Sequence, residues 1–148
     1  MNILRMILWL GFAASISAAT DKENRREFAK TFAVEAAANA RLEELSKLPY
    51  TDEVRLAMAA EADKVHTQAK KVEAIFLQRL HPQLPKHFGE FSTGYFLLGD
   101  SFRTNIQSAY VDGSKLIRLW VVFWEANSED VLRKLEAIDR PASASTKN

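Results

Sequence analysis

Apolar side chains recur at intervals of three or four residues along most of this chain, and this spacing limits the fold most strongly. The clearest stripe consists of Val54, Met58, Ala62, Val65, Ala69, Val72, Phe76 and Leu80. Residues at these intervals lie on one face of an α-helix, whereas a half-buried strand would need alternation. The sequence therefore predicts an all-α protein with four to five amphipathic helices arranged like a bundle.

Two long helices, over about residues 21–48 and 51–81, are predicted to form an antiparallel hairpin. Thr20 and Glu23 have the spacing of a capping box, which satisfies two free amide groups at a helix start. Pro49 ends the first helix, because the residue before a proline is pushed out of the α-helical region. A connection of so few residues makes the second helix fold back on the first.

A helical unit packed on this hairpin is predicted for the C-terminal half. Residues 81–87 contain two prolines and are predicted as a loop, and helical spacing resumes over residues 91–124. Asp112 and Gly113 also form a hairpin turn signal, and the residues after them have strand-like composition. This stretch is either two helices broken or kinked at Gly113, which the spacing favours, or a β-hairpin. A further short helix is predicted to start at Ser128.

Aromatic residues are concentrated in this second half. Of the thirteen aromatic residues beyond position 20, nine lie between Phe88 and Trp124. Most of them are predicted to form the core, because large aromatic side chains dominate buried area. Their number exceeds what one helix face can bury, so the excess either lines an apolar ligand pocket or forms an exposed patch that a partner covers.

Three segments are predicted along the chain. Residues 1–19 have the pattern of a secretory signal peptide, with Arg5 before an apolar stretch and small residues up to Ala19. That stretch is shorter than the roughly 20 apolar residues that cross a membrane. Residues 20–140 are predicted to form a single helical domain and residues 141–148 a disordered tail. The protein is therefore expected to be periplasmic or secreted, with a membrane involved only during export.

Charge and cysteine content exclude several classes of function. Removal of residues 1–19 takes away Arg5 and leaves 19 basic and 19 acidic residues. Nucleic-acid binding is not expected, because it relies on an excess of clustered basic residues. The chain has no cysteine, which excludes thiolate catalysis and cysteine-based metal centres.

One short segment resembles a catalytic motif. Gly99-Asp100-Ser101 follows an apolar run and resembles the nucleophile block of the GDSL hydrolases. That family also uses an Asp-x-x-His segment downstream, and no histidine follows His87 in this chain. A serine without a base is a weak nucleophile. No enzymatic activity is therefore predicted, and a serine hydrolase using Ser101 is kept as a remote alternative.

No cofactor or metal ion is predicted either. Asp63 and His66 have the spacing of half a di-metal site in a helical bundle, but the other ligands of such a site are missing. His81, His87 and Glu90 could gather around an ion, but a loop with two prolines gives them no fixed geometry.

The sequence predicts an exported, non-catalytic protein that works by binding another protein, as an adaptor, inhibitor, immunity-type or secretion-accessory factor. The predicted contact surface consists of Phe88, Phe91 and Phe96, with His87 and Glu90 as a polar rim. It rests on the expectation that residues 81–94 are irregular, since irregular segments on a rigid scaffold often carry binding. The alternative function is a carrier of an apolar small molecule or lipid.

Overall fold

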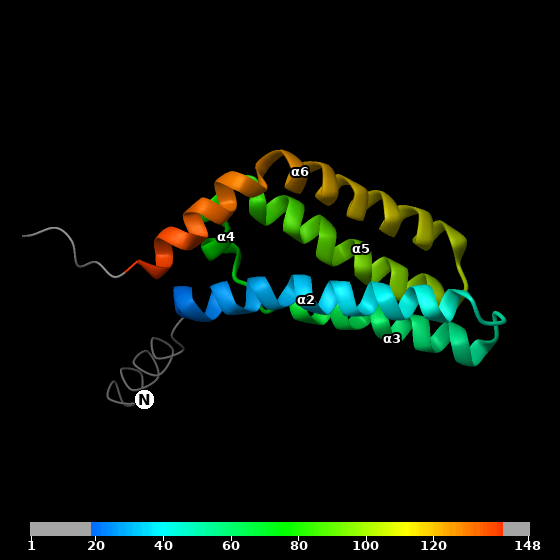
Figure 1. The fold of residues 1–148 in the computed structure, drawn as a ribbon. Coiled ribbons are helices and arrows are strands. Elements are labelled where there is room, and N and C mark those ends of the chain that lie inside the picture. Colours follow the sequence, from blue (N-terminus) through cyan, green and yellow to red (C-terminus); the bar gives the residue numbers. More distant parts are fainter. Residues whose placement is uncertain (1–18, 141–148) are drawn as a thin grey trace, which may run out of the picture.

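The computed structural model describes residues 19–140, and this part of the chain contains five helices and no strand (Figure 1). The helices are α2 (Asp21–Ser46), α3 (Asp52–Ala69), α4 (Ala74–Leu80), α5 (Leu84–Thr104) and α6 (Gln107–Asp139). They pack against one another as a bundle, which confirms the predicted all-α fold. The predicted signal peptide, apart from Ala19, and the predicted tail lie outside the described residues.

The first two long helices begin at the predicted caps. The Thr20 hydroxyl accepts a hydrogen bond from the Glu23 N–H at 3.2 Å, and the Glu23 carboxylate accepts one from the Thr20 N–H at 2.9 Å. The Thr51 hydroxyl likewise accepts from the Val54 N–H at 3.3 Å. These bonds satisfy amide groups that have no partner within the helix. α2 and α3 then lie side by side as the predicted hairpin (Figure 1).

The remaining helices extend the bundle from α3. α3 packs against both α2 and α5, and α5 packs in turn against α6. The short α4 contacts α5 and α6. In Figure 1, α6 lies at the edge of the bundle, and α5 separates it from the hairpin. The backbones of α2 and α6 come closest where α2 begins and α6 ends (Figure 1), and large side chains connect the two helices farther along.

A cluster of aromatic side chains joins α2, α5 and α6. The Phe28 ring lies 6.0 Å from that of Trp124, and the Phe32 ring lies 5.1 Å from it. Trp120 contacts Phe91 at 5.4 Å between ring centroids. Edge-on and tilted contacts of this kind add to the free energy of burial itself. The prediction that most of the aromatic residues belong to the core is confirmed.

The helix predicted over residues 51–81 is in fact two helices, α3 and α4. Asn24, on α2, holds the turn between them. Its side-chain oxygen accepts a hydrogen bond from the Glu73 N–H at 2.8 Å, and its amide donates to the Glu73 carboxylate at 3.2 Å. Glu73 is the N-cap residue of α4 and makes no side-chain cap of its own. Asn24 therefore caps α4 from a neighbouring helix.

The predicted proline loop is wrong from Leu84 onward. α5 begins at Leu84 and carries Pro85 in its first turn. Proline is tolerated in this turn because its missing N–H would have no partner there in any case. His87, Phe88 and Phe91 consequently belong to a regular helix.

The chain reverses at Asn105 and continues straight through Gly113. Asn105 has φ 57° and ψ 36°, and it ends α5 in the left-handed region that asparagine tolerates better than most residues. α6 then runs without interruption from Gln107 to Asp139. The predicted break at Gly113, the β-hairpin alternative and the separate helix from Ser128 are all wrong.

Candidate contact surfaces

Two of the three phenylalanines predicted to form a contact surface are core residues. Phe88 and Phe91 are buried on the side of α5 that faces α2 and α6, where their rings contact Phe28 and Trp120. They cannot form an exposed surface, so this part of the prediction is corrected. Phe96 is exposed, and its ring lies 5.2 Å from that of His66. All three phenylalanines lie on one helix, α5, whose register turns Phe88 and Phe91 toward the core and Phe96 toward the surface.

The two predicted rim residues pair with each other instead. His87 Nδ1 lies 2.8 Å from a carboxylate oxygen of Glu90, and both side chains are half-buried. The His87 ring stacks on Phe123 of α6 at 4.3 Å, and the His81 ring contacts Phe123 edge-on at 5.2 Å. The His87 ring therefore joins α5 to α6, and the His81 ring joins the end of α4 to α6. Nowhere in residues 19–140 do three histidine, cysteine or acidic side chains gather as metal ligands would.

Asp63 and His66 likewise serve the packing of α3 on α5. Arg103 donates to both carboxylate oxygens of Asp63, at 2.7 and 3.3 Å. His66 Nδ1 lies 2.9 Å from the Ser92 carbonyl oxygen and 3.0 Å from its hydroxyl. The two side chains point to separate partners on α5, so they form no common site.

Ser101 is buried within α5. Its hydroxyl donates a hydrogen bond to the Leu98 carbonyl oxygen at 2.8 Å. In the GDSL motif the serine is exposed at the end of a strand, whereas here the segment lies inside a helix. The likeness is therefore confined to three letters of sequence.

A buried polar link between α2 and α5 was not predicted. The Tyr95 hydroxyl donates to the Glu35 carboxylate at 2.9 Å and lies 3.0 Å from the Asn39 side-chain amide. Burial raises the pKa of Glu35, and the hydrogen bond from Tyr95 partly opposes that shift. Burial, together with the nearby Glu35 carboxylate, also raises the pKa of Tyr95. This link therefore holds a partly desolvated acid between α2 and α5.

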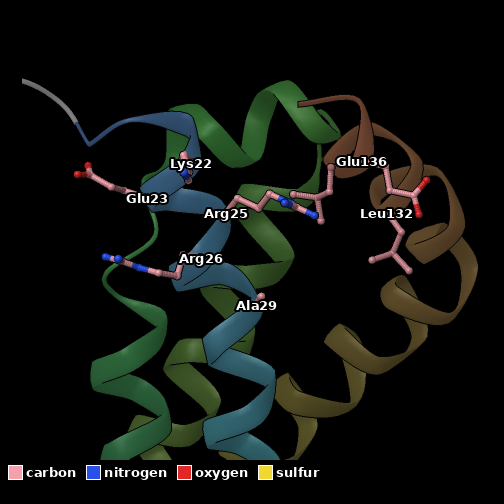
Figure 2. A pocket seen from close by; sticks show the side chains of 8 residues that line it. Lys22, Glu23, Arg25, Arg26, Ala29, Leu132 and Glu136 are labelled. Carbon is pink, nitrogen blue, oxygen red and sulfur yellow. The ribbon is translucent and has the colours of Figure 1, made fainter. Parts of the chain in front are cut away.

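An open hollow lies where the start of α2 faces the end of α6 (Figure 2), with a volume of about 640 Å³. It is lined by Lys22, Glu23, Arg25, Arg26, Ala29, Leu132, Leu135 and Glu136. Leu132, Ala29 and Leu135 provide apolar surface, and Leu132 is 49% exposed. In Figure 2, Arg25 reaches from α2 toward α6, whereas the carboxylate of Glu136 points away from α2. The hollow thus has an apolar floor and a rim with charges of both signs.

A second exposed surface lies in the middle of α6. Residues 116–124 are apolar except for Arg118. A helix that is apolar on every face is expected to be covered on every face, but α5 covers only one side here. Leu119, Val121 and Val122 are exposed as a result. None of the described helices, α6 included, combines the length and hydropathy needed to cross a membrane.

Comparisons with models of protein families, with curated proteins and with solved structures find no match for this chain. The class that the fold defines is a helical-bundle protein, and the two exposed surfaces are its candidate sites of contact.

Proposed function

We propose that the protein is exported after removal of residues 1–19 and acts by binding another protein, without catalysis. Such a protein would serve as an adaptor, an inhibitor, an immunity-type factor or a secretion-accessory factor. The hollow between α2 and α6 is the proposed binding site.

The composition of the hollow is the observation that carries this proposal. Protein interfaces combine an apolar centre with a polar rim. Leu132, Leu135 and Ala29 would form the centre, and Lys22 and Glu136 belong to the rim. A partner would seat an apolar side chain against Leu132 and match the rim with charges of opposite sign.

The side chains that were candidates for catalysis or metal binding take part in packing within and between helices, which supports a role in binding. The Ser101 hydroxyl is buried and bonded within its own helix. His66 and His87 are engaged in contacts between helices. The open apolar surface, in contrast, has no covering within residues 19–140.

Photo-crosslinking in the source cells tests this proposal. A photoreactive amino acid replaces Leu132 in one variant and Leu56, on α3, in the control. The two leucines are almost equally exposed, at 49% and 50%, so the control matches the test in accessibility. One defined protein crosslinked at position 132, and absent at position 56, is the expected result.

Two outcomes contradict the proposal. Equal crosslinking at both positions would mean that the hollow is not a specific site. A lipid or other hydrophobic molecule crosslinked at position 132, with no protein product, would favour the alternative function as a carrier.

A further inference from the structure

The outward face of α6 carries a pattern of residues that is compatible with a copy of itself. Six residues at alternating steps of four and three form this face, which we call the α6 outer face: Val111, Lys115, Arg118, Val122, Glu125 and Glu129. Steps of this kind keep side chains on one side of a helix. All six are exposed, and Figure 1 shows α6 at the edge of the bundle.

Charge on the α6 outer face is divided about Val122. Lys115 and Arg118 precede Val122, and Glu125 and Glu129 follow it. Lys115 and Glu129 are each seven residues from Val122. In an antiparallel pair of α6 helices centred on Val122, Lys115 of each copy faces Glu129 of the other. Arg118 of each copy faces position 126 of the other, one residue from Glu125. The twofold axis repeats each of these pairs.

These four charged side chains are unpaired within residues 19–140, because none of them makes a hydrogen bond or an ion pair there. The next turn of α6 behaves differently, since Asp130 pairs with Lys134 at 2.9 Å and also with Arg133. Val122, between the unpaired groups, is 61% exposed. The α6 outer face therefore offers an apolar centre and two charge pairs that a second copy would complete.

We propose that the protein self-associates through the α6 outer face, as an antiparallel twofold dimer with Val122 at its centre. The paired stretch from Lys115 to Glu129 spans about four helical turns. This is a small interface, so the dimer is expected to dissociate in the micromolar range. The dimer contact covers residues 115–129 of α6, whereas the hollow uses residues of α6 only from Leu132 onward. Self-association and the proposed function can therefore fail independently.

Sedimentation velocity of the purified protein, from micromolar to several hundred micromolar, tests self-association. The dimer fraction should rise with concentration and fall with added salt, which screens the charge pairs. Val122→Glu places two carboxylates together at the twofold axis and should weaken dimerisation at least about tenfold. Ile75→Glu is the matched control, since Ile75 lies on α4 and is 60% exposed. That variant should dimerise like the unaltered protein.

Charge reversal gives a stricter test. Lys115→Glu and Glu129→Lys should each weaken the dimer, and the chain with both changes should regain it, because the pairs re-form with reversed sign. All these positions are exposed, and circular dichroism verifies that each variant keeps its helices. A protein that stays monomeric at every concentration, or a double variant as weak as the single ones, overturns the proposal. Loss of binding to a different protein in Val122→Glu, with no dimer in the unaltered chain, would assign the face to that partner instead.

Discussion

Gly113 of α6 lies against the backbone of Gly94 in α5, so closely that a Cβ on Gly113 would stand 2.7 Å from the Gly94 carbonyl oxygen. A Cβ on Gly94 would likewise lie 2.9 Å from the Gly113 carbonyl oxygen. Both of these carbonyl oxygens belong to the backbone, which cannot turn aside as a flexible side chain does. The two glycines therefore set how closely α5 and α6 approach, and this pair of helices holds α6 on the bundle.

Gly113→Ala should destabilise the protein by roughly 1–3 kcal/mol, the usual cost of overpacking a well-packed contact. The gain in helix propensity opposes this loss by about 1 kcal/mol at most. Gly89→Ala is the control, because Gly89 also lies in α5 and a Cβ there would meet nothing within 4 Å. That variant should gain about 0.5–1 kcal/mol. Urea denaturation measures both, and equal effects would mean that the helices are not in backbone contact.

Replacing Glu35 by Gln should raise the melting temperature at neutral pH. Because burial raises the pKa of Glu35, the folded state favours the protonated acid. The resulting stability is fully present below the ordinary pKa of 4.5 and is lost as the pH rises through the folded pKa. Glutamine carries no charge and can still accept the hydrogen bond from Tyr95. The advantage of the variant should therefore vanish below pH 4.5.

Glu27→Gln should have the opposite sign and serves as the control for that experiment. The Glu27 carboxylate accepts a hydrogen bond from the Gln68 amide at 2.7 Å, and this bond lowers its pKa. Its contribution to stability is present above the ordinary pKa of 4.5 and is lost as the pH falls through the folded pKa. The Glu27 variant should thus melt lower than the unaltered protein at neutral pH. A shift of the same sign in both variants would contradict the assignment of the two environments.

Asn24→Ala should cost roughly 1–3 kcal/mol, because it leaves the Glu73 N–H without a partner in a part-buried position. The loss should be accompanied by fraying of α4, which hydrogen exchange detects as faster exchange over residues 74–80. Lys22→Ala, an exposed change on the same helix, should stay within about 0.5 kcal/mol. Unchanged exchange in α4 would show that Asn24 is not its cap.

Cleavage of the chain should leave a mature N-terminus at or near Thr20. The small residues up to Ala19 provide the expected cleavage site, and the capping box of α2 starts at the next residue. N-terminal sequencing of the protein recovered outside the cytoplasm checks this. A chain that still begins at Met1 would mean that residues 1–19 are retained as an anchor.

Features that depend on neighbouring residues could be predicted from the sequence, whereas those that depend on distant ones could not. The caps at Thr20 and Thr51 are local, and the structure has both. The turn before α4 depends on Asn24, which is 49 residues from Glu73. The apolar stripe runs through this turn unchanged, so it carried no sign of the break.

The candidate contact surfaces also depend on residues that are distant in the sequence, and they were therefore harder to predict. The sequence predicts a loop at Phe88 and Phe91 because prolines such as Pro82 and Pro85 usually break a helix, but Pro85 lies in the first turn of α5. The hollow depends on where α2 and α6 meet, which no stripe spacing predicts. The charge pattern of the α6 outer face was visible in the sequence. The predicted break at Gly113 and the predicted separate helix from Ser128 assign these six residues to three different segments, so the sequence alone does not place them on one helix face.

The affinity of the crosslinked partner for variants of the hollow tests the central claim most directly. Isothermal titration calorimetry would compare the unaltered protein with Leu132→Glu and with the equally exposed control Leu56→Glu. A binding site on the hollow predicts that Leu132→Glu raises Kd at least about tenfold, a loss of about 1.4 kcal/mol, while Leu56→Glu leaves Kd unchanged. Equal Kd values for the two variants would contradict the claim that the protein binds its partner between α2 and α6.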